Sequence, residues 1–363
     1  MDRIRILMVM PPVGPLGSGE AGGVETFLMN LAPILAGRGH RVGIVAPEGS
    51  LVPPGAAVYQ VEGNASPSAT RADRAARYHA LTGGVLENMW EQALGLEREY
   101  DAITGVSYDW LPYYLTPFFR TPVGHWITIG SAIDEVDRII EKRWRSGGLK
   151  LALHTSAQCR TFSFLRDEPL TGGRIHLLYG GVDTRVFEYR AEPENRLCWA
   201  ARISPEKGLE DAVAVARALR MPLDVCGKIQ DEGYWNAVMG GVHGAEIVYH
   251  GFLGPAQLRQ RYGGARAMLM TPKWTEAFGN TAIESLACGT PVVAYDQGGP
   301  AEIVEHGTSG MLAAQGDIAG LIAGVKAAFQ LDRKAARARA EQFSFERMAD
   351  RFEAWMASIA PKG

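Results

Sequence analysis

The sequence lacks several features that would indicate a metalloprotein, a disulfide-stabilised protein or a membrane protein. Its 363 residues include only four cysteines, which lie far apart and form no CxxC or Cys/His zinc pattern. No apolar run approaches the length of a membrane span, and an apolar strand-like run begins at Ile4 with no signal peptide before it. We therefore expect a cytoplasmic protein with reduced, buried cysteines and no transmembrane segment.

The chain also lacks a strong charge of either sign. Its formal net charge is −3, which gives no reason to expect nucleic acid as a partner. The length of 363 residues suits two domains of ordinary size, each able to bury its own core. A soluble two-domain enzyme fits this composition.

Short β-branched runs alternate with helical stretches, which is typical of parallel sheets covered by helices. The predicted strands cover 4–9, 42–46, 102–105, 123–127, 151–154, 175–178, 197–200, 223–225, 247–249, 267–270 and 291–294. The polar segment 188–195 carries a proline and predicts an interdomain linker. We expect an α/β protein with domains at 1–188 and 189–343. An amphipathic C-terminal helix at about 344–363 would join the first domain.

Two carboxylates, Glu276 and Glu284, lie eight positions apart around the predicted start of a helix. Gly279 and Asn280 open that helix, and Gly289 ends it. A helix N-terminus suits a phosphate, and the carboxylates could hold sugar hydroxyls on either side of it. Taken alone, two such carboxylates are more simply a loop charge and a solvated helix position.

The surrounding run changes that interpretation. A Glu, seven residues and a Glu are followed by Ala-Cys-Gly-Thr-Pro-Val at 287–292, Gly-Gly-Pro-Ala-Glu at 298–302 and Gly-Thr-Ser-Gly at 307–310. These ordered motifs resemble the nucleotide-sugar site of family-four retaining glycosyltransferases. The resemblance implies a GT-B fold, with two Rossmann-like domains whose parallel sheets face across a cleft. It implies a UDP-sugar donor as a co-substrate and no cofactor.

The same resemblance assigns roles to the donor-site residues. Glu276 would contact the donor sugar and Glu284 the ribose, and the backbone near Phe278, Gly279, Asn280 and Thr281 would serve the phosphates. The run 200–208 resembles the family's Gly-Arg-x-x-x-x-Lys-Gly element, with Arg202 and Lys207 in its basic positions and Ala201 in place of the usual glycine. Two fixed cations would neutralise the charge that grows on a departing nucleoside diphosphate. Without the resemblance they would be surface residues in a turn.

A glycine-rich loop follows the first predicted strand and ends in Gly22 and Gly23. It resembles the family's Gly-Gly-x-Glu loop, which would face the donor phosphates. The alternative is a dinucleotide fingerprint, since Gly17 to Gly22 matches GxGxxG and Glu48 follows the second strand. That fingerprint begins directly after its strand, whereas Gly17 lies seven positions beyond Met10.

Aromatic residues gather at 108–119, after the strand that ends at Gly105. With the loops at 12–19 and 270–280, this run is similar to the bacterial UDP-glucose:tetrahydrobiopterin glucosyltransferases. The resemblance implies a reduced pterin as acceptor. The candidate acceptor-binding residues are Asp109, Trp110, Tyr113, Tyr114 and His125. Asp109 could instead cap a turn, His125 could be a core histidine, and many relatives have a histidine where this chain has Thr128.

The chain has no Asp-x-Asp pair of the kind that holds a divalent metal on a diphosphate in other glycosyltransferases. Arg202, Lys207 and helix N-termini would replace the metal, which predicts metal independence. No nucleophilic carboxylate stands out, so retention would follow from front-face attack.

Two other functions remain open. A relative acting on a lipid or polysaccharide could use the basic residues of 138–145 at a membrane, although acidic residues interrupt that helix. A non-catalytic nucleotide-sugar-binding protein would not need Arg202, Lys207 and Glu276 together.

Overall fold

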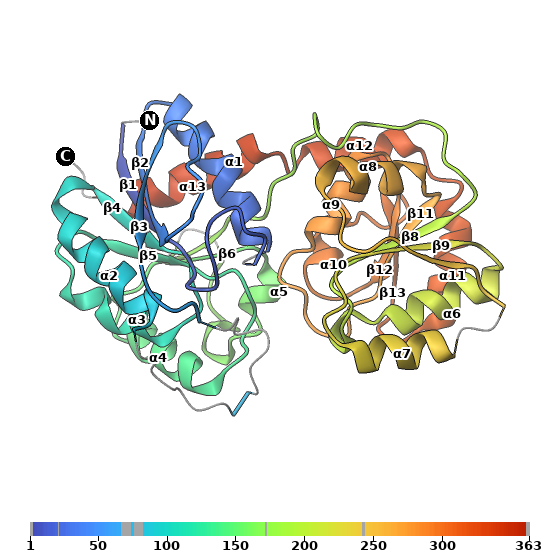
Figure 1. Ribbon diagram of the computed structural model, residues 1–363, viewed down its shortest axis with the longest axis horizontal. Coiled ribbons are helices and arrows are strands. Elements are labelled where there is room, and N and C mark those ends of the chain that lie inside the picture. Colours follow the sequence, from blue (N-terminus) through green and yellow to red (C-terminus); the bar gives the residue numbers. More distant parts are fainter. Residues whose placement is uncertain are drawn as a thin grey trace. The chain divides into compact units, whose positions relative to one another are not determined.

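The computed structural model describes residues 3–20, 22–66, 74–75, 83–170, 173–241 and 244–360. The chain forms two compact units (Figure 1). Unit 1 consists of Met1–Tyr179 with Phe345–Gly363, and unit 2 consists of Gly180–Ser344. Each unit is a parallel sheet with helices on both faces, so the alternating strand and helix pattern of the sequence gives the expected fold class.

Unit 1 contains a seven-stranded parallel sheet in the order β3-β2-β1-β4-β5-β6-β7. Its strands are β1 Arg5–Val9, β2 Arg41–Pro47, β3 Ala56–Val61, β4 Ala102–Gly105, β5 Val123–Trp126, β6 Leu151–Leu153 and β7 Ile175–Leu177. Six of them begin and end within one residue of the prediction. β3 was not predicted, because this edge strand is half-exposed and has no continuous buried apolar run.

Unit 2 contains a six-stranded parallel sheet in the order β10-β9-β8-β11-β12-β13. Its strands are β8 Leu197–Ala200, β9 Leu223–Cys226, β10 Ile247–Tyr249, β11 Ala267–Met270, β12 Val292–Tyr295 and β13 Gly310–Ala313. β13 was not predicted; it begins at Gly310, the last glycine of the Gly-Thr-Ser-Gly motif. The order of both sheets is that of a Rossmann fold.

Helices connect these strands. In unit 1 they are α1 Gly23–Gly37, α2 Val85–Leu96, α3 Trp110–Leu115, α4 Asp134–Arg145, α5 Ser156–Cys159 and α13 Phe345–Ile359. In unit 2 they are α6 Leu209–Leu219, α7 Glu232–Gly240, α8 Pro255–Gly264, α9 Asn280–Ala287, α10 Gly299–Ile303, α11 Ile318–Ala328 and α12 Arg333–Glu341. In unit 2, α6 packs against α11, whereas α9 packs against α8 and α12.

The C-terminal helix α13 belongs to unit 1, where it packs against α1. Its apolar face is buried, and a Cβ on Gly124 of β5 would lie only 2.8 Å from the Trp355 ring. At its polar edge, Glu353 is 3.2 Å from His40 Nε2 and 3.0 Å from Arg38 Nη1. Helix α13 therefore covers one side of the sheet of unit 1 with its apolar face, as its amphipathic sequence pattern predicts.

The units divide at Tyr179/Gly180, ahead of the expected boundary at 188/189. The polar segment that predicted a linker is attached to unit 2. The backbone N–H of Arg190 donates to Cys288 O at 3.0 Å, and that of Glu194 donates to Gly264 O at 2.7 Å. Polar composition identified an exposed segment but did not show which unit its backbone would join.

Candidate active site

The strand order of unit 2 reverses between β8 and β11, which is where open α/β sheets bind ligands. β8 leads to the 3₁₀ turn Pro205–Lys207, and β11 leads to the loop that precedes α9. Both loops leave the carboxyl ends of adjacent strands, so they meet at one edge of the sheet. There Lys207 and Glu276, predicted from two separate motifs, form an ion pair.

An aromatic residue that the motifs did not indicate, Trp274, contacts both members of the Lys207–Glu276 pair. Trp274 Nε1 donates a hydrogen bond to Glu276 Oε2 over 3.2 Å, and Lys207 Nζ donates to the same oxygen. The Lys207 ammonium also lies 4.7 Å from the centre of the Trp274 ring, within the range of a cation–π contact. The Lys207 and Glu276 side chains are only 13% and 16% exposed, so little water screens their attraction.

The charge state of Glu276 follows from these neighbours. Burial raises the pKa of its carboxyl, but the charge and hydrogen bond of Lys207 outweigh burial, and Trp274 and Arg202 act in the same direction. The resulting pKa lies below its ordinary value, so Glu276 is an anion at neutral pH. In the part of the chain that the structure describes, no hydrogen bond ends on Glu276 Oε1. That oxygen can accept a hydrogen bond from a sugar hydroxyl.

Arg202 lies at the same strand end but outside the ion pair. Its Nη1 donates to Gln230 Oε1 over 2.7 Å, and its Nη2 lies 3.8 Å from Glu206 Oε1. The Arg202 side chain is 38% exposed. Because Gln230 is neutral and holds only one edge of the guanidinium, the other N–H groups can bind a phosphate. Gln230, in the loop after β9, was not predicted.

A glycine brings the Lys207 turn onto the end of β11. Gly208 has a φ of 66°, and a Cβ there would lie 2.1 Å from the carbonyl oxygen of Thr271. The Thr271 hydroxyl donates to Gly208 O over 2.8 Å and accepts from Trp199 Nε1 over 3.2 Å. Only glycine permits this close approach, which explains the Lys-Gly pair in the motif.

The Gly-Gly-Pro motif supports the loop that carries Glu276. A Cβ on Gly298 would lie 2.6 Å from the carbonyl oxygen of Glu276, and one on Gly299 would lie 1.9 Å from that of Phe278. The N–H of Gly299 donates to Glu276 O over 2.7 Å. The two motifs are therefore parts of one backbone contact, although 21 positions separate Phe278 from Gly299.

Helix α9 begins and ends where the sequence predicted. Gly279 precedes it with a φ of 105°, and Gly289 follows it with a φ of 85°. The first N–H groups of a helix have no partners within it, so Asn280 and Thr281 present donors beside a partial positive charge. Asn280 Oδ1 is buried and has no hydrogen-bond partner among the described residues. The N–H groups at the start of α9 could bind an anion, and Asn280 Oδ1 could accept a hydrogen bond from a donor group.

Glu284, one turn into α9, is half-buried and accepts a hydrogen bond from the Tyr262 hydroxyl at Oε2 over 3.1 Å. Burial raises the pKa of its carboxyl to about 7, although the bond from Tyr262 lowers it. Glu284 therefore changes charge near neutral pH, unlike Glu276. Tyr262 was not predicted, because nothing in the sequence of α8 links it to the helix that follows.

In unit 1 the glycine-rich loop is organised by Glu25. This residue is buried in α1, and its Oε2 accepts the backbone N–H groups of Gly17 over 2.6 Å and Gly19 over 2.9 Å. Gly22 is the N-cap of α1 with a φ of 60°, and Gly23 is its first residue. The apparent GxGxxG is thus a loop folded around an internal carboxylate, rather than a turn placed directly after the strand. This geometry disfavours the dinucleotide alternative.

The predicted acceptor residues do not form one group. Asp109 is the N-cap of α3 and accepts the N–H of Trp110 over 2.7 Å, so it caps a helix as the alternative interpretation had it. Burial raises the pKa of the Asp109 carboxyl to about 6, against the backbone bonds that lower it. Trp110 and the exposed Tyr114 lie side by side, with ring centroids 5.9 Å apart.

Tyr113 and His125 belong to the core. Both are fully buried, and their rings stack with centroids 4.3 Å apart. His125 Nε2 lies 2.7 Å from the Thr116 hydroxyl, and burial lowers the pKa of the imidazole to about 3. In this conformation neither ring is open to an acceptor, and His125 is neutral. The core interpretation of His125 therefore fits its surroundings.

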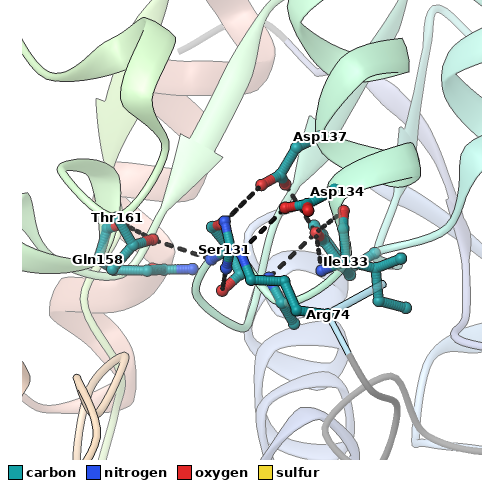
Figure 2. A network of polar contacts seen from close by, with 9 residues as sticks. Arg74, Ser131, Ile133, Asp134, Asp137, Gln158 and Thr161 are labelled. Carbon is teal, nitrogen blue, oxygen red and sulfur yellow. Dashed lines mark hydrogen bonds and ion pairs between the residues drawn. The ribbon is translucent and has the colours of Figure 1, made fainter. Parts of the chain in front are cut away.

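A polar network that was not predicted holds the loop between β5 and α4 (Figure 2). Asp137 accepts hydrogen bonds from Ser131 Oγ over 2.5 Å and from the Tyr108 hydroxyl over 2.6 Å. On the other side Gln158 Nε2 donates to the carbonyl oxygens of Ile127 and Ile129, each over 2.8 Å. The loop lies at the carboxyl end of β5, so this network fixes a second strand end suited to binding.

Arg74 covers this network from outside. It lies 2.9 Å from Asp134 and donates to Ser131 Oγ over 2.9 Å (Figure 2). Helix α4 also carries Trp144, which is buried beneath Arg174 with the guanidinium 3.6 Å from the ring centre. Trp144 is therefore not exposed to a membrane, and only the basic residues of this helix would remain for the membrane-facing alternative.

In residues 3–360, apart from the gaps given above, no three acidic, histidine or cysteine side chains gather as a metal site. Within the same ranges no helix has the length and apolar character needed to cross a bilayer.

Comparisons with known proteins agree with this geometry. Residues 183–344 match the family described as Glycosyl transferases group 1, and this range holds Arg202, Lys207, Glu276 and Glu284. Glycogen synthase of Mycobacterium tuberculosis is 25% identical, over 96% of this chain and 91% of that protein. D-inositol 3-phosphate glycosyltransferase of Mycobacterium marinum is 26% identical, over 96% and 84%.

Solved structures share the fold. Anabaena Alr3699/HepE in complex with UDP has a TM-score of 0.74 and 17% identity, over 98% of this chain and all of the other. Sucrose-phosphate synthase of Thermosynechococcus elongatus has a TM-score of 0.72 and 17% identity, over 98% of each chain. Residues 183–344 therefore match a group 1 glycosyltransferase domain, and the chain as a whole has the GT-B type of fold.

Proposed function

We propose that this glycosyltransferase moves a glucosyl group from UDP-glucose to a small acceptor, with retention and without a metal ion, and that the acceptor is a reduced pterin. The observation that carries the donor part is the Lys207–Glu276 pair at the strand-order reversal, directly beside the N-terminus of α9. UDP-glucose is chosen because Anabaena HepE, which shares the fold, was solved in complex with it.

The donor residues have separate roles in this proposal. Lys207 and Arg202 neutralise the diphosphate, together with the backbone N–H groups from Phe278 to Thr281. Glu276 accepts hydrogen bonds from the sugar hydroxyls through Oε1. Glu284 accepts hydrogen bonds from the ribose, and Gly22 and Gly23 are the proposed phosphate contacts of unit 1.

The transfer is a front-face substitution. The bond between the anomeric carbon and the phosphate oxygen breaks first, through an oxocarbenium-like state. The acceptor oxygen then bonds to the same face of the sugar, and its proton passes to the departing phosphate oxygen. The cations Lys207 and Arg202 stabilise the negative charge that develops on the diphosphate, so they contribute most in the transition state.

The pterin acceptor rests on the sequence resemblance and on the aromatic rings of unit 1. The exposed Tyr114 and its neighbour Trp110 offer flat surfaces on which a heterocycle can stack. Asp109, whose carboxyl has a raised pKa, lies at the start of the same helix and could bind an amino group. The names of the relatives favour two other acceptor classes, a polysaccharide and an inositol phosphate.

The first experiment is a UDP-release assay with UDP-glucose and EDTA, with and without tetrahydrobiopterin. Release that the pterin stimulates and EDTA does not suppress would support the whole proposal. Slow release that the pterin does not change would support the UDP-glucose donor and contradict the pterin acceptor. Glycans and inositol phosphates would then be tested as acceptors. UDP binding without any turnover would identify a non-catalytic binding protein. The anomeric configuration of the product, measured by NMR, tests retention.

A further inference from the structure

Tyr262 connects helix α8 to the carboxylate that we assign to the ribose. Its side chain is fully buried, and its hydroxyl donates to Glu284 Oε2 over 3.1 Å. Its backbone is fixed as well, because the Thr290 hydroxyl donates to Tyr262 O over 2.6 Å and Arg333 donates to that hydroxyl over 2.8 Å. The phenol therefore approaches Glu284 from a rigid support.

We propose that Tyr262 is a positioning residue, which holds one carboxylate oxygen of Glu284 and leaves the other free for the ribose of a nucleoside diphosphate. This inference rests on the proposed function, because it assumes that Glu284 receives the ribose. It adds a residue from a different helix, outside every motif of the donor site.

The direction of the hydrogen bond gives Tyr262 its effect. Burial raises the pKa of its phenol well above the ordinary value, so Tyr262 stays protonated and acts as the donor. A carboxylate can accept several hydrogen bonds, and only one oxygen of Glu284 is engaged. Glu284 Oε1 therefore remains for a ribose hydroxyl, while the bond at Oε2 keeps the carboxylate from rotating.

The same bond sets the pH at which Glu284 ionises. Burial raises the pKa of the Glu284 carboxyl to about 7, and the Tyr262 bond is the interaction that opposes burial. Other titratable groups on or beside the packed elements are Arg259 and Arg261 on α8, Cys288 directly after α9, Cys198 on β8, Cys226 on β9, Glu302 on α10, Tyr295 on β12, and Arg333 and Arg337 on α12. Tyr295 is directed to Asp211, and the two arginines of α12 bind backbone carbonyls at the C-terminal end of α9.

The consequence is a pH-dependent affinity for UDP. The ionised carboxylate accepts the ribose hydroxyls, so affinity falls as the pH decreases through the pKa of Glu284. Without the Tyr262 hydroxyl this pKa rises further, and the midpoint of the affinity curve moves to higher pH. Affinity should then be weak at neutral pH and should recover in alkaline solution.

The test is UDP binding by calorimetry across the neutral pH range, for wild type and Tyr262→Phe. We expect Y262F to bind UDP about tenfold more weakly at neutral pH, which is the contribution of one hydrogen bond to a charged group. The loss should shrink as the pH increases, and kcat at saturating donor should not change. Glu284→Gln should bind weakly at every pH. Tyr234→Phe is the matched control, because Tyr234 also donates to a carboxylate in unit 2, that of Glu210.

An unchanged affinity curve in Y262F, or an equal loss of affinity at every pH, would overturn the inference. If Y262F does not fold, a fluorotyrosine placed at position 262 keeps the shape and strengthens the donor, so the midpoint should move to lower pH; an unmoved midpoint would count against Tyr262. If wild type does not bind UDP at any pH, the proposed function itself fails and this inference fails with it.

Discussion

The two Rossmann-like sheets share a strand order but use their carboxyl ends differently. At the reversal point of unit 2, opposite charges meet in a shielded place, Lys207 against Glu276, with Arg202 nearby. At the corresponding ends of unit 1, carboxylates hold the chain itself, as Glu25 does for its glycine loop and Asp109 for the start of α3. The same fold thus gathers charged side chains that can bind a ligand in unit 2, whereas in unit 1 the carboxylates bind the backbone of the protein itself.

This difference indicates how each unit contributes to function. Charges held at the start of a helix suit an anionic diphosphate, which has the same chemistry in every nucleotide-sugar donor. Loops that are capped internally, with aromatic side chains beside them, suit an acceptor whose shape varies from one relative to another. The comparison therefore predicts charge-dependent effects in unit 2 and effects on loop geometry in unit 1.

The largest effect should follow the loss of a cation in unit 2. Lys207→Ala or Arg202→Ala should reduce turnover by about a hundredfold or more, as removal of a transition-state charge stabiliser does. The measurement is kcat by UDP release. Lys273→Ala is the control, because Lys273 is also a lysine paired with a glutamate, Glu210, but its side chain is 42% exposed and has no assigned contact with the donor. A K207A variant with wild-type turnover would remove Lys207 from the mechanism.

Glu276→Gln separates the two roles of the ion pair. Turnover should fall by about tenfold or more, because the hydrogen bonds to a charged group are lost. UDP without a sugar should bind a few-fold more tightly, since Lys207 no longer has a competing counter-ion and repulsion of the phosphate is reduced. Calorimetry of UDP binding measures this. Weaker UDP binding in E276Q would show that the pair stabilises the site instead of competing with the donor.

In unit 1, Tyr108→Phe should act through the loop it holds. Its hydroxyl accepts the N–H groups of Ala132 over 3.1 Å and Ile133 over 2.9 Å, as well as donating to Asp137. Loss of that hydroxyl should lower the free energy of unfolding by about 1–3 kcal/mol. The acceptor KM should rise while UDP affinity stays the same. Tyr114→Phe, whose ring is exposed, should leave stability unchanged, and equal stability loss in both variants would contradict the network.

The effect that is smallest near neutral pH concerns the protonation of His125. Its pKa is lowered to about 3 by burial, below the ordinary value of 6.5, so the unfolded chain binds a proton that the folded chain does not. Stability is therefore complete above pH 6.5 and falls by about 1.4 kcal/mol for each unit below it. Denaturant unfolding measured from neutral to mildly acidic pH tests this. His125→Phe should reduce the slope, and an unchanged slope would place the titration elsewhere.

Much of unit 2 could be predicted because its signals are local. The start and end of α9 follow from Gly279 and Gly289, and each strand before a site loop is a short, fully buried apolar run. Trp274 and Tyr262 could not be predicted in the same way. Their contacts with Glu276 and Glu284 depend on side-chain direction, and for Tyr262 on the packing of one helix against another.

In unit 1 the same reasoning located the aromatic run but not its orientation. Tyr113 and Tyr114 are adjacent in sequence, yet Tyr113 is fully buried while Tyr114 is 47% exposed. Successive residues of a helix point about a quarter-turn apart, so one short helix places one ring in the core and the next in solvent. The edge strand β3 and the boundary at Tyr179 were missed because neither has a distinct local pattern.

The sequence by itself determined the two parallel sheets, the order of the donor motifs and the chemical type of each donor residue. Short-range periodicity, glycine placement and motif spacing carry that information, since they act within a few residues. Only the tertiary structure decided which of these residues meet. Lys207 and Glu276 are 69 positions apart and become partners because their strands are neighbours in the sheet. Burial raises the pKa of both carboxyls, but Lys207 outweighs burial at Glu276, so Glu276 stays ionised while Glu284 titrates near neutral pH.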